Sequence, residues 1–251
     1  MKVLLIGHLL GDFYFQSDEM ARRKKSFRCT IKHCLYYCIV MCVVLAMSTG
    51  KTIDYICLGV QIGLLHLLVD GVKCIFYKYN KIRESELIVF AIDQLIHIVV
   101  LFLFSRLWIM EFDISWFPGI SERVLNSMST VLTVIIAFLL CGKPAAIAVS
   151  LVFDLIPKTI EAAKNNEKNS TESKKQEDAK VGAWIGILER EIILILGVLG
   201  EYSAIGFVVA AKSLAMHSQF DNNPAFAEKY LIGTLVSSLI ALLSIVMVKI
   251  L

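Results

Sequence analysis

Long apolar segments separated by shorter polar ones run through the whole chain. The apolar segments lie at about residues 3–17, 29–48, 53–77, 86–108, 123–141, 183–199, 202–216 and 230–250. Most of them approach the length of about 17 to 25 residues that an α-helix needs to cross the hydrocarbon core of a bilayer. The bilayer offers no water to exposed backbone groups, so spanning segments of this kind must be helical. We therefore predict an all-α fold, a polytopic transmembrane helix bundle of about seven or eight helices.

Two stretches do not follow the pattern of one helix for each apolar segment. Residues 183–216 are short for two complete crossings and a turn, so they predict either two short or broken helices or one long helix. Residues 144–160 are apolar but contain Asp154 and Pro157. Because proline ends or kinks a helix, this stretch favours an interfacial or half-membrane helix.

A polar segment separates two apolar regions. Residues 161–180 have mixed charge and no large apolar side chain, a composition that buries too little surface to hold one fixed structure. We therefore predict a disordered linker at 161–180, between a transmembrane bundle at 1–160 and C-terminal transmembrane helices at 181–251. The two regions show no internal repeat, which disfavours a transporter built from inverted repeats.

Composition and charge agree with a membrane protein and set its orientation. The chain is 57% hydrophobic and 19% charged, whereas soluble domains have about half and about a quarter. Basic residues are dense in the loop after the first segment, sparse in the next loop, and dense again at 78–83. The positive-inside rule then predicts an N-terminus outside and the linker in the cytoplasm. The net charge of +3 is small, so we expect the lipid bilayer and not nucleic acid as the partner.

Three of the apolar segments carry a histidine and an aspartate four residues apart. The pairs are His8 with Asp12, His66 with Asp70, and Asp93 with His97. This spacing puts both side chains on one helix face. Counted at about 1.5 Å per residue from the predicted cytoplasmic ends, the aspartates lie roughly 7 to 12 Å inside the membrane, and the histidines lie one turn deeper. The reversed order of the third pair matches the depths in an antiparallel helix.

Two further residues belong to the same level. His33 enters it from the second apolar segment, and Lys73 continues the face that carries His66 and Asp70. A charged side chain near the bilayer centre costs about 2.5 to 3.5 kcal/mol, whereas a polar contact between membrane helices contributes only about 0.6 kcal/mol. The repeated pattern therefore favours a functional centre over hydrogen bonding between helices alone.

Imidazole and carboxylate groups are the ligands of zinc, manganese and iron in proteins. We predict a divalent metal, zinc or manganese, among His8, Asp12, His33, His66, Asp70, Asp93 and His97. Such an ion compensates buried acids and lowers the pKa of a bound water towards neutrality. Asp70, Lys73 and Asp93 are the predicted catalytic residues, with Lys73 placed to hold a phosphate or developing negative charge. The resulting hypothesis is a metal-dependent hydrolase of an amphipathic or phosphate-bearing substrate.

Two other functions stay open at this point. Histidine and aspartate are also the usual relay groups of transporters, so the same cluster suits a proton- or cation-coupled transporter or channel. A third option is an assembly or sensing protein in which the cluster is only structural. In the second half, Glu189 and Arg190 lie inside an apolar run. They either pair internally with Lys212 or add a polar lining to the site of the first half.

The strings HLLGDFYFQSD, HLLVDGVK and IDQLIH resemble a family of bacterial integral membrane proteins known only as a domain of unknown function. The resemblance covers roughly residues 1–105, and it implies no activity. In pattern alone, the paired histidines and aspartates are also similar to a bacterial inner-membrane family described as metal-dependent hydrolases. Both resemblances imply a multi-pass protein of the bacterial inner (cytoplasmic) membrane, and the second implies a hydrolase.

Overall fold

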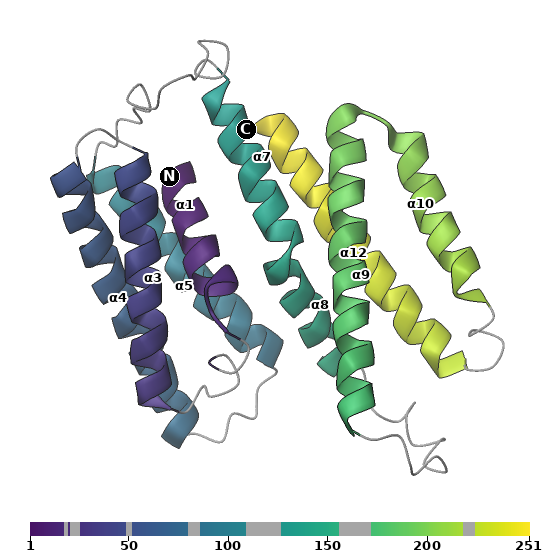
Figure 1. Ribbon diagram of the computed structural model, residues 1–251, viewed down its shortest axis with the longest axis horizontal. Helices are drawn as coiled ribbons and strands as arrows, with labels where there is room; N and C mark the ends of the chain where they lie inside the picture. Colours follow the sequence, from purple (N-terminus) through teal and green to yellow (C-terminus); the bar gives the residue numbers. More distant parts are fainter. Residues whose placement is uncertain are drawn as a thin grey trace. The chain divides into compact units, whose positions relative to one another are not determined.

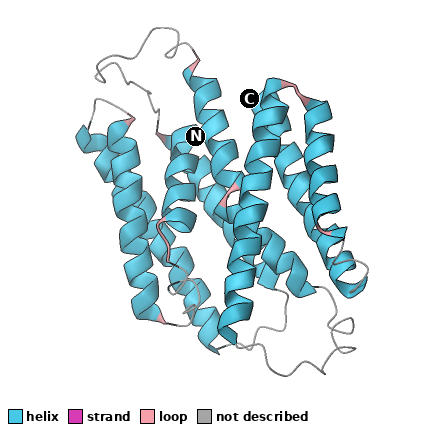
Figure 2. Ribbon diagram, turned by 45° about the vertical axis from the view of Figure 1, so that its right-hand side comes forward, coloured by secondary structure: helices cyan, strands magenta, loops and turns pink. Residues whose placement is uncertain are grey.

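The computed structural model describes residues 1–17, 20, 26–48, 52–79, 86–108, 127–155, 172–217 and 224–251, and all regular elements among them are helices (Figures 1 and 2). The helices are α1 (Lys2–Leu9), η1 (Leu10–Tyr14), α3 (Phe27–Met47), α4 (Thr52–Tyr79), α5 (Glu86–Leu107), α7 (Met128–Cys141), α8 (Lys143–Leu155), α9 (Glu172–Leu199), α10 (Tyr202–Ala215) and α12 (Pro224–Ile250). The predicted all-α class is confirmed.

Five helical segments in the described part of the chain are long and apolar enough to cross a membrane. They are Phe27–Met47, Ile53–Tyr79, Glu86–Leu107, Met128–Leu155 and Ala227–Ile250. Their outer faces expose large apolar side chains, for example Leu35, Leu64 and Leu95, each about 60% exposed. A continuous apolar exterior of this kind suits lipid and is unfavourable in water. The fold is therefore that of a membrane-embedded helix bundle.

The two ambiguous stretches form parts of the long helix α9 (28 residues) and the short helices α10 and α8 (14 and 13 residues). Residues 183–216 form the apolar part of α9 and all of α10, joined by a turn at Gly200, whose φ of +84° is one that glycine adopts without strain. The helix α8 follows α7 after the single residue Gly142, and Pro144 lies in its first turn, where a missing N–H costs no helix hydrogen bond. Residues 128–155 are thus one apolar segment with a break in the middle.

The helices form two compact units, Met1–Leu139 and Leu140–Leu251. This boundary differs from the one predicted at residues 161–180, because α8 packs against α9 and α12 and so belongs with them. The helix α9 begins at Glu172, so residues 172–180 of the predicted linker are helical. Residues 161–171 lie outside the described part of the chain.

The N-terminal unit is built around a close antiparallel pair of helices, α3 and α4, with α1 beside α3 and α5 (Figure 1). Glycines on α4 let the pair approach closely. A Cβ atom on Gly59 would lie 2.7 Å from Sγ of Cys42, and one on Gly63 would lie 2.8 Å from Sγ of Cys38. Small residues at such a contact allow backbones in a membrane to pack tightly.

We expect Gly59→Ala to lower the free energy of unfolding by about 1 to 3 kcal/mol, because the added methyl group overpacks the contact with the Cys42 backbone. Gly71→Ala on the same helix is the matched control, because its nearest neighbour is a ring atom of Phe27 at 4.0 Å. Alanine favours a helix over glycine by about 0.8 to 1 kcal/mol, so this variant should be neutral or more stable. Unfolding in detergent micelles measures both, and equal stabilities would contradict the prediction.

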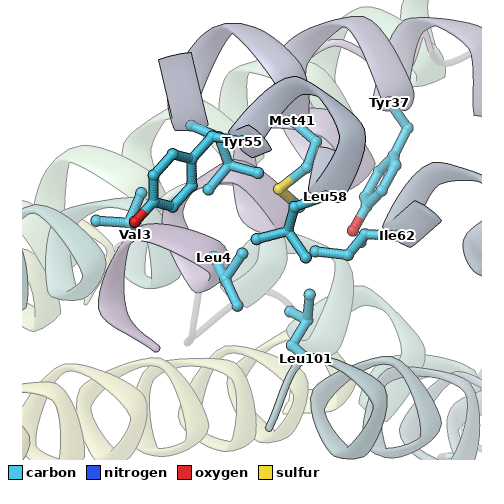
Figure 3. Close-up of a cluster of buried hydrophobic side chains, with 9 residues drawn as sticks. Val3, Leu4, Tyr37, Met41, Tyr55, Leu58, Ile62 and Leu101 are labelled. Atoms are coloured by element: carbon cyan, nitrogen blue, oxygen red, sulfur yellow. The ribbon is translucent and has the colours of Figure 1, made fainter. Parts of the chain in front are cut away.

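The apolar core of the N-terminal unit lies toward one end of its helices (Figure 3). Its buried residues are Val3, Leu4, Tyr37, Met41, Leu45, Tyr55, Leu58, Ile62 and Leu101. They come from the start of α1, the second half of α3, the first half of α4 and the second half of α5. Since neighbouring helices run in opposite directions, these positions share one level, and the other ends of the same helices carry the polar residues described next.

Candidate metal centre

The seven predicted metal ligands lie together in the N-terminal unit. They are His8 of α1, Asp12 of η1, His33 of α3, His66 and Asp70 of α4, and Asp93 and His97 of α5. Each is at most 9% exposed. Four histidines and three aspartates from separate helices thus share one buried region, as their predicted depths require.

Three donor atoms in this region face one another. Nε2 of His33 lies 3.1 Å from Oδ1 of Asp12 and 3.2 Å from Nε2 of His66. The third side, from Nε2 of His66 to Oδ1 of Asp12, is 3.8 Å. A tetrahedral ion with bonds of about 2.0 to 2.2 Å separates its ligand atoms by about 3.3 to 3.6 Å. The three donor atoms therefore match three corners of such a site. We call Asp12, His33 and His66 together the three-ligand face.

Asp70 and Cys34 lie on the other side of the imidazole pair. Oδ2 of Asp70 is 3.5 Å from Nε2 of both His33 and His66. Cys34, His66 and Asp70 form a second group whose donor atoms lie within 4.8 Å of one another. His66 is common to both groups, so it is the central imidazole of the region.

Lys73 joins two of the aspartates. Its Nζ lies 2.7 Å from Oδ1 of Asp70, and it donates to Oδ1 and Oδ2 of Asp93 at 3.0 and 2.9 Å. Asp70 therefore directs one oxygen at the ammonium group and the other at the imidazole pair. Lys73 thus forms an ion pair with Asp70 and hydrogen bonds with Asp93, so both carboxylates compete with a phosphate for its ammonium group.

His8 lies beside the three-ligand face without pointing a free nitrogen at it. Gln94 donates from Nε2 to Oδ2 of Asp12 at 2.9 Å, so its Oε1 accepts from Nε2 of His8 at 3.2 Å. Nδ1 of His8 then accepts from the Tyr37 hydroxyl at 3.3 Å. Both ring nitrogens of His8 are therefore engaged in hydrogen bonds. His8 was predicted as a metal ligand, and in the structure it orients Asp12 through Gln94. This tautomer is assigned from the network.

Tyr37 and Gln94 are contacts that the predicted site did not include. The Tyr37 ring stacks on the His66 ring, with centroids 3.7 Å apart and an interplanar angle of 1°. The stack fixes the plane in which Nε2 of His66 points. Tyr37 follows His33 by four residues, so the spacing that identified the histidine–aspartate pairs also relates these two. Gln94 is adjacent to Asp93 in the sequence.

His97 is held by its own helix. Its Nδ1 donates to the backbone carbonyl of Asp93 at 2.9 Å, so Nε2 is left as an acceptor, and it has no hydrogen-bond partner among the described residues. A backbone partner on one ring nitrogen is the usual way to fix the tautomer of a metal-binding histidine. A small cavity of about 10 Å³ lies beside His66 and His97, and its other lining residues are mostly apolar.

A π-helical turn places Asp12. In η1 the backbone N–H of Phe15 bonds to the carbonyl of Leu10, five residues earlier, at 2.9 Å. The preceding Gly11 packs against α3, where an added Cβ would lie 2.8 Å from the Tyr37 ring. The missing side chain lets the end of the first helix approach α3 and brings Asp12 to His33. Single π-turns inside α-helices are frequent at functional sites.

The C-terminal unit has its own buried polar residues. Lys212 pairs with Glu189, the internal ion pair that was one of the two predicted alternatives. Arg190 is 2% exposed and donates to the carbonyls of Cys141 and Gly142 at 2.6 and 3.3 Å. It also donates to the Ser237 hydroxyl at 3.0 Å. The guanidinium thus binds both carbonyls at the break between α7 and α8, where the Gly142 carbonyl also accepts from the backbone N–H of Ala146 at 3.1 Å.

Comparison with known families bears on the N-terminal region. Residues 1–123 match the family model described as "Protein of unknown function (DUF3307)". The matched residues include the whole three-ligand face and Lys73, and they confirm the predicted relationship to a family of unknown function. Searches among curated proteins and among solved structures found no match.

Proposed function

We propose that this domain is a membrane-embedded metal centre that binds one divalent cation, zinc or manganese, on the three-ligand face and hydrolyses an amphipathic or phosphate-bearing substrate. The observation that carries the proposal is the mutual approach of Asp12 Oδ1, His33 Nε2 and His66 Nε2, with separations of 3.1, 3.2 and 3.8 Å. Three protein ligands from imidazole and carboxylate groups, with a further position left for water or substrate, are typical of catalytic zinc sites.

The charge of the region supports a single divalent ion. Asp12, Asp70 and Asp93 carry three negative charges, and Lys73 carries one positive charge. With neutral histidines, a divalent ion supplies the two positive charges that remain to be balanced. Uncompensated buried charges cost several kcal/mol each in a medium of low dielectric constant, so a neutral cluster is the stable one in a bilayer.

The residues around the three-ligand face have distinct parts in the proposed hydrolysis. A bound ion supplies Lewis acidity and lowers the pKa of a coordinated water. Gln94 and His8 hold the Asp12 carboxylate in place. Asp70, 3.5 Å from both imidazole nitrogens, is the proposed base that accepts a proton. The proton that Asp70 takes from the attacking water is the one that it returns to the leaving group, while the Lys73 ammonium, held by Asp93, offsets developing negative charge.

A closed apolar end favours a hydrolase over a transporter. Beyond the polar level, Leu4, Met41, Leu45 and Leu58 are fully buried, and Figure 3 shows Leu4, Met41 and Leu58 packed together. Among the described residues, these apolar side chains lie between the polar cluster and the contact of Lys2 with Ser129 near the start of α1. A proton or cation path has to reach both faces of the membrane, whereas a catalytic site needs only one opening.

Metal analysis combined with an activity assay tests the proposal. Protein purified in detergent and dialysed against zinc or manganese should hold about one ion per chain, and it should hydrolyse phosphate esters with lipid-like tails in a chelator-sensitive way. We expect Asp70→Asn to keep the ion and to slow hydrolysis about 100-fold or more, the usual contribution of a general base. Asp54→Asn, an exposed acid on the same helix, should behave as wild type.

Two results would overturn the proposal. One is a folded protein that hydrolyses these substrates without metal. The other is proton or cation flux in proteoliposomes that stops in Asp93→Asn, with no hydrolysis under any condition. The second result would support the relay function instead.

A further inference from the structure

A second set of metal-type ligands lies directly beside the three-ligand face. Asp70, Asp93 and His97 offer donor atoms within 4.8 Å of one another, and all three side chains are buried. The Lys73 ammonium group screens the repulsion between the two carboxylates, because its Nζ lies 2.7 Å from Asp70 and 2.9 Å from Asp93. These distances are those of charge-assisted hydrogen bonds. The ammonium group is thus the cation that these ligands hold.

Asp70 connects this ammonium to the three-ligand face. Its Oδ1 contacts Lys73, and its Oδ2 lies 3.5 Å from Nε2 of His33 and of His66. In sites with two metal ions, the ions lie about 3.5 to 4 Å apart and act together on attacking and leaving oxygens. Asp70 lies between two cation positions in the same way as a carboxylate that bridges two metal ions. Here the ammonium group of Lys73 occupies one of the two positions.

His97 lies beside the second position. Its Nδ1 donates to the backbone carbonyl of Asp93 and lies 3.9 Å from Oδ1 of the same residue, and Nε2 of this 4% exposed side chain has no hydrogen-bond partner among the described residues. Two carboxylates and an imidazole suit a divalent ion as well as an ammonium group. The second position therefore has the chemistry of a metal site, and the lysine side chain fills it.

We propose that Lys73 is a built-in second cation, which takes one position of a two-cation centre and restricts the protein to a single metal ion. The inference rests on the proposed metal binding at the three-ligand face. The net charge of the cluster also supports a single ion. A second divalent ion, added to the lysine and the first ion, would leave two uncompensated positive charges in the bilayer. Without the lysine, one divalent ion leaves a negative site that attracts another.

The metal content of Lys73 variants tests this inference. Zinc per chain should rise from about one in the wild type to about two in Lys73→Ala and Lys73→Ser. Lys73→Arg keeps a cation at the position and should stay at about one. Lys78→Ala, an exposed lysine on the same helix, is the matched control and should also stay at about one. Adding Asp93→Asn to Lys73→Ala should return the content to about one, because it removes a ligand of the second position.

The outcomes separate this inference from the proposed function. A folded Lys73→Ala with one zinc, beside a wild type with one, overturns the inference alone. A folded wild type that holds no zinc overturns the proposed function and, with it, the two-cation centre. The Lys73→Ala variant then shows separately whether the lysine occupies a metal position, because one bound ion in that variant supports this part and no bound ion overturns it. A wild type that holds two tightly bound zinc ions overturns the inference even where no alanine or serine variant folds. Circular dichroism and gel filtration in detergent establish which variants are folded.

Discussion

His66→Ala is expected to weaken zinc or manganese binding more than about 100-fold, beyond the 10- to 100-fold loss that substitutions of supporting residues cause. Nε2 of His66 is one of the three atoms of the three-ligand face, and His66 also belongs to the group formed with Cys34 and Asp70. Its loss leaves one imidazole and one carboxylate, too few to hold a divalent ion tightly. Competition with a coloured chelator measures the affinity, and elemental analysis measures the bound metal.

His217→Ala is the matched control for this prediction. His217 is the histidine outside the cluster, and its side chain is exposed. Its replacement should leave the metal content unchanged. If His66→Ala folds and keeps one ion with wild-type affinity, the three-ligand face is not the binding site.

Arg190→Leu is expected to destabilise the C-terminal unit by about 1 to 3 kcal/mol. The guanidinium donates to two carbonyls and to a hydroxyl in a buried site. The Gly142 carbonyl keeps the backbone N–H of Ala146, but the Cys141 carbonyl loses its side-chain donor, and a buried acceptor left without a donor costs about 1 to 3 kcal/mol. Lipid offers these carbonyls no replacement for the lost donors. Unfolding in mixed micelles with increasing denaturing detergent measures the change.

Two variants establish the cause of the Arg190 effect. Arg190→Lys keeps the charge but not the fork of donors, so its stability should lie between the wild type and the leucine variant. Arg106→Leu removes an exposed arginine and should change little. Metal content should stay the same in all three, because the three-ligand face belongs to the N-terminal unit. Unchanged unfolding of Arg190→Leu would show that other groups satisfy the carbonyls of Cys141 and Gly142.

The fold class and the cluster could be predicted from the sequence because both depend on local periodicity. Segment length gives the helices, and the i, i+4 pairs together with helix direction give the level at which His66, Asp70, Asp93 and His97 meet. The same reasoning placed His33 at this level, since the depth of a residue in the membrane was counted from the end of its helix. These inferences need no knowledge of which helices are neighbours, only that they are antiparallel.

Other features depend on contacts between residues far apart in the sequence. The orientation of His8 follows from Gln94, 86 residues later, which contacts Asp12 at the same time. The unit boundary follows from the packing of α8 against α9 and α12, which come later in the sequence. The π-turn at Asp12 depends on how closely Gly11 packs on Tyr37. No local pattern encodes these pairings, so they could not be predicted from the sequence alone.

The early end of the first helix has a consequence for the surrounding bilayer. The turn η1 ends at Tyr14, whereas α3 extends from the level of His33 back to Phe27, and α4 continues from Asp70 to Tyr79. At about 1.5 Å per residue, these helices run roughly 9 and 13 Å past the polar level. The non-helical backbone from Phe15 to Ser17 thus lies at membrane depth, where it needs hydration or burial in protein. We expect such a mismatch to thin the bilayer locally, so that headgroups and water reach inward to the level of Asp12.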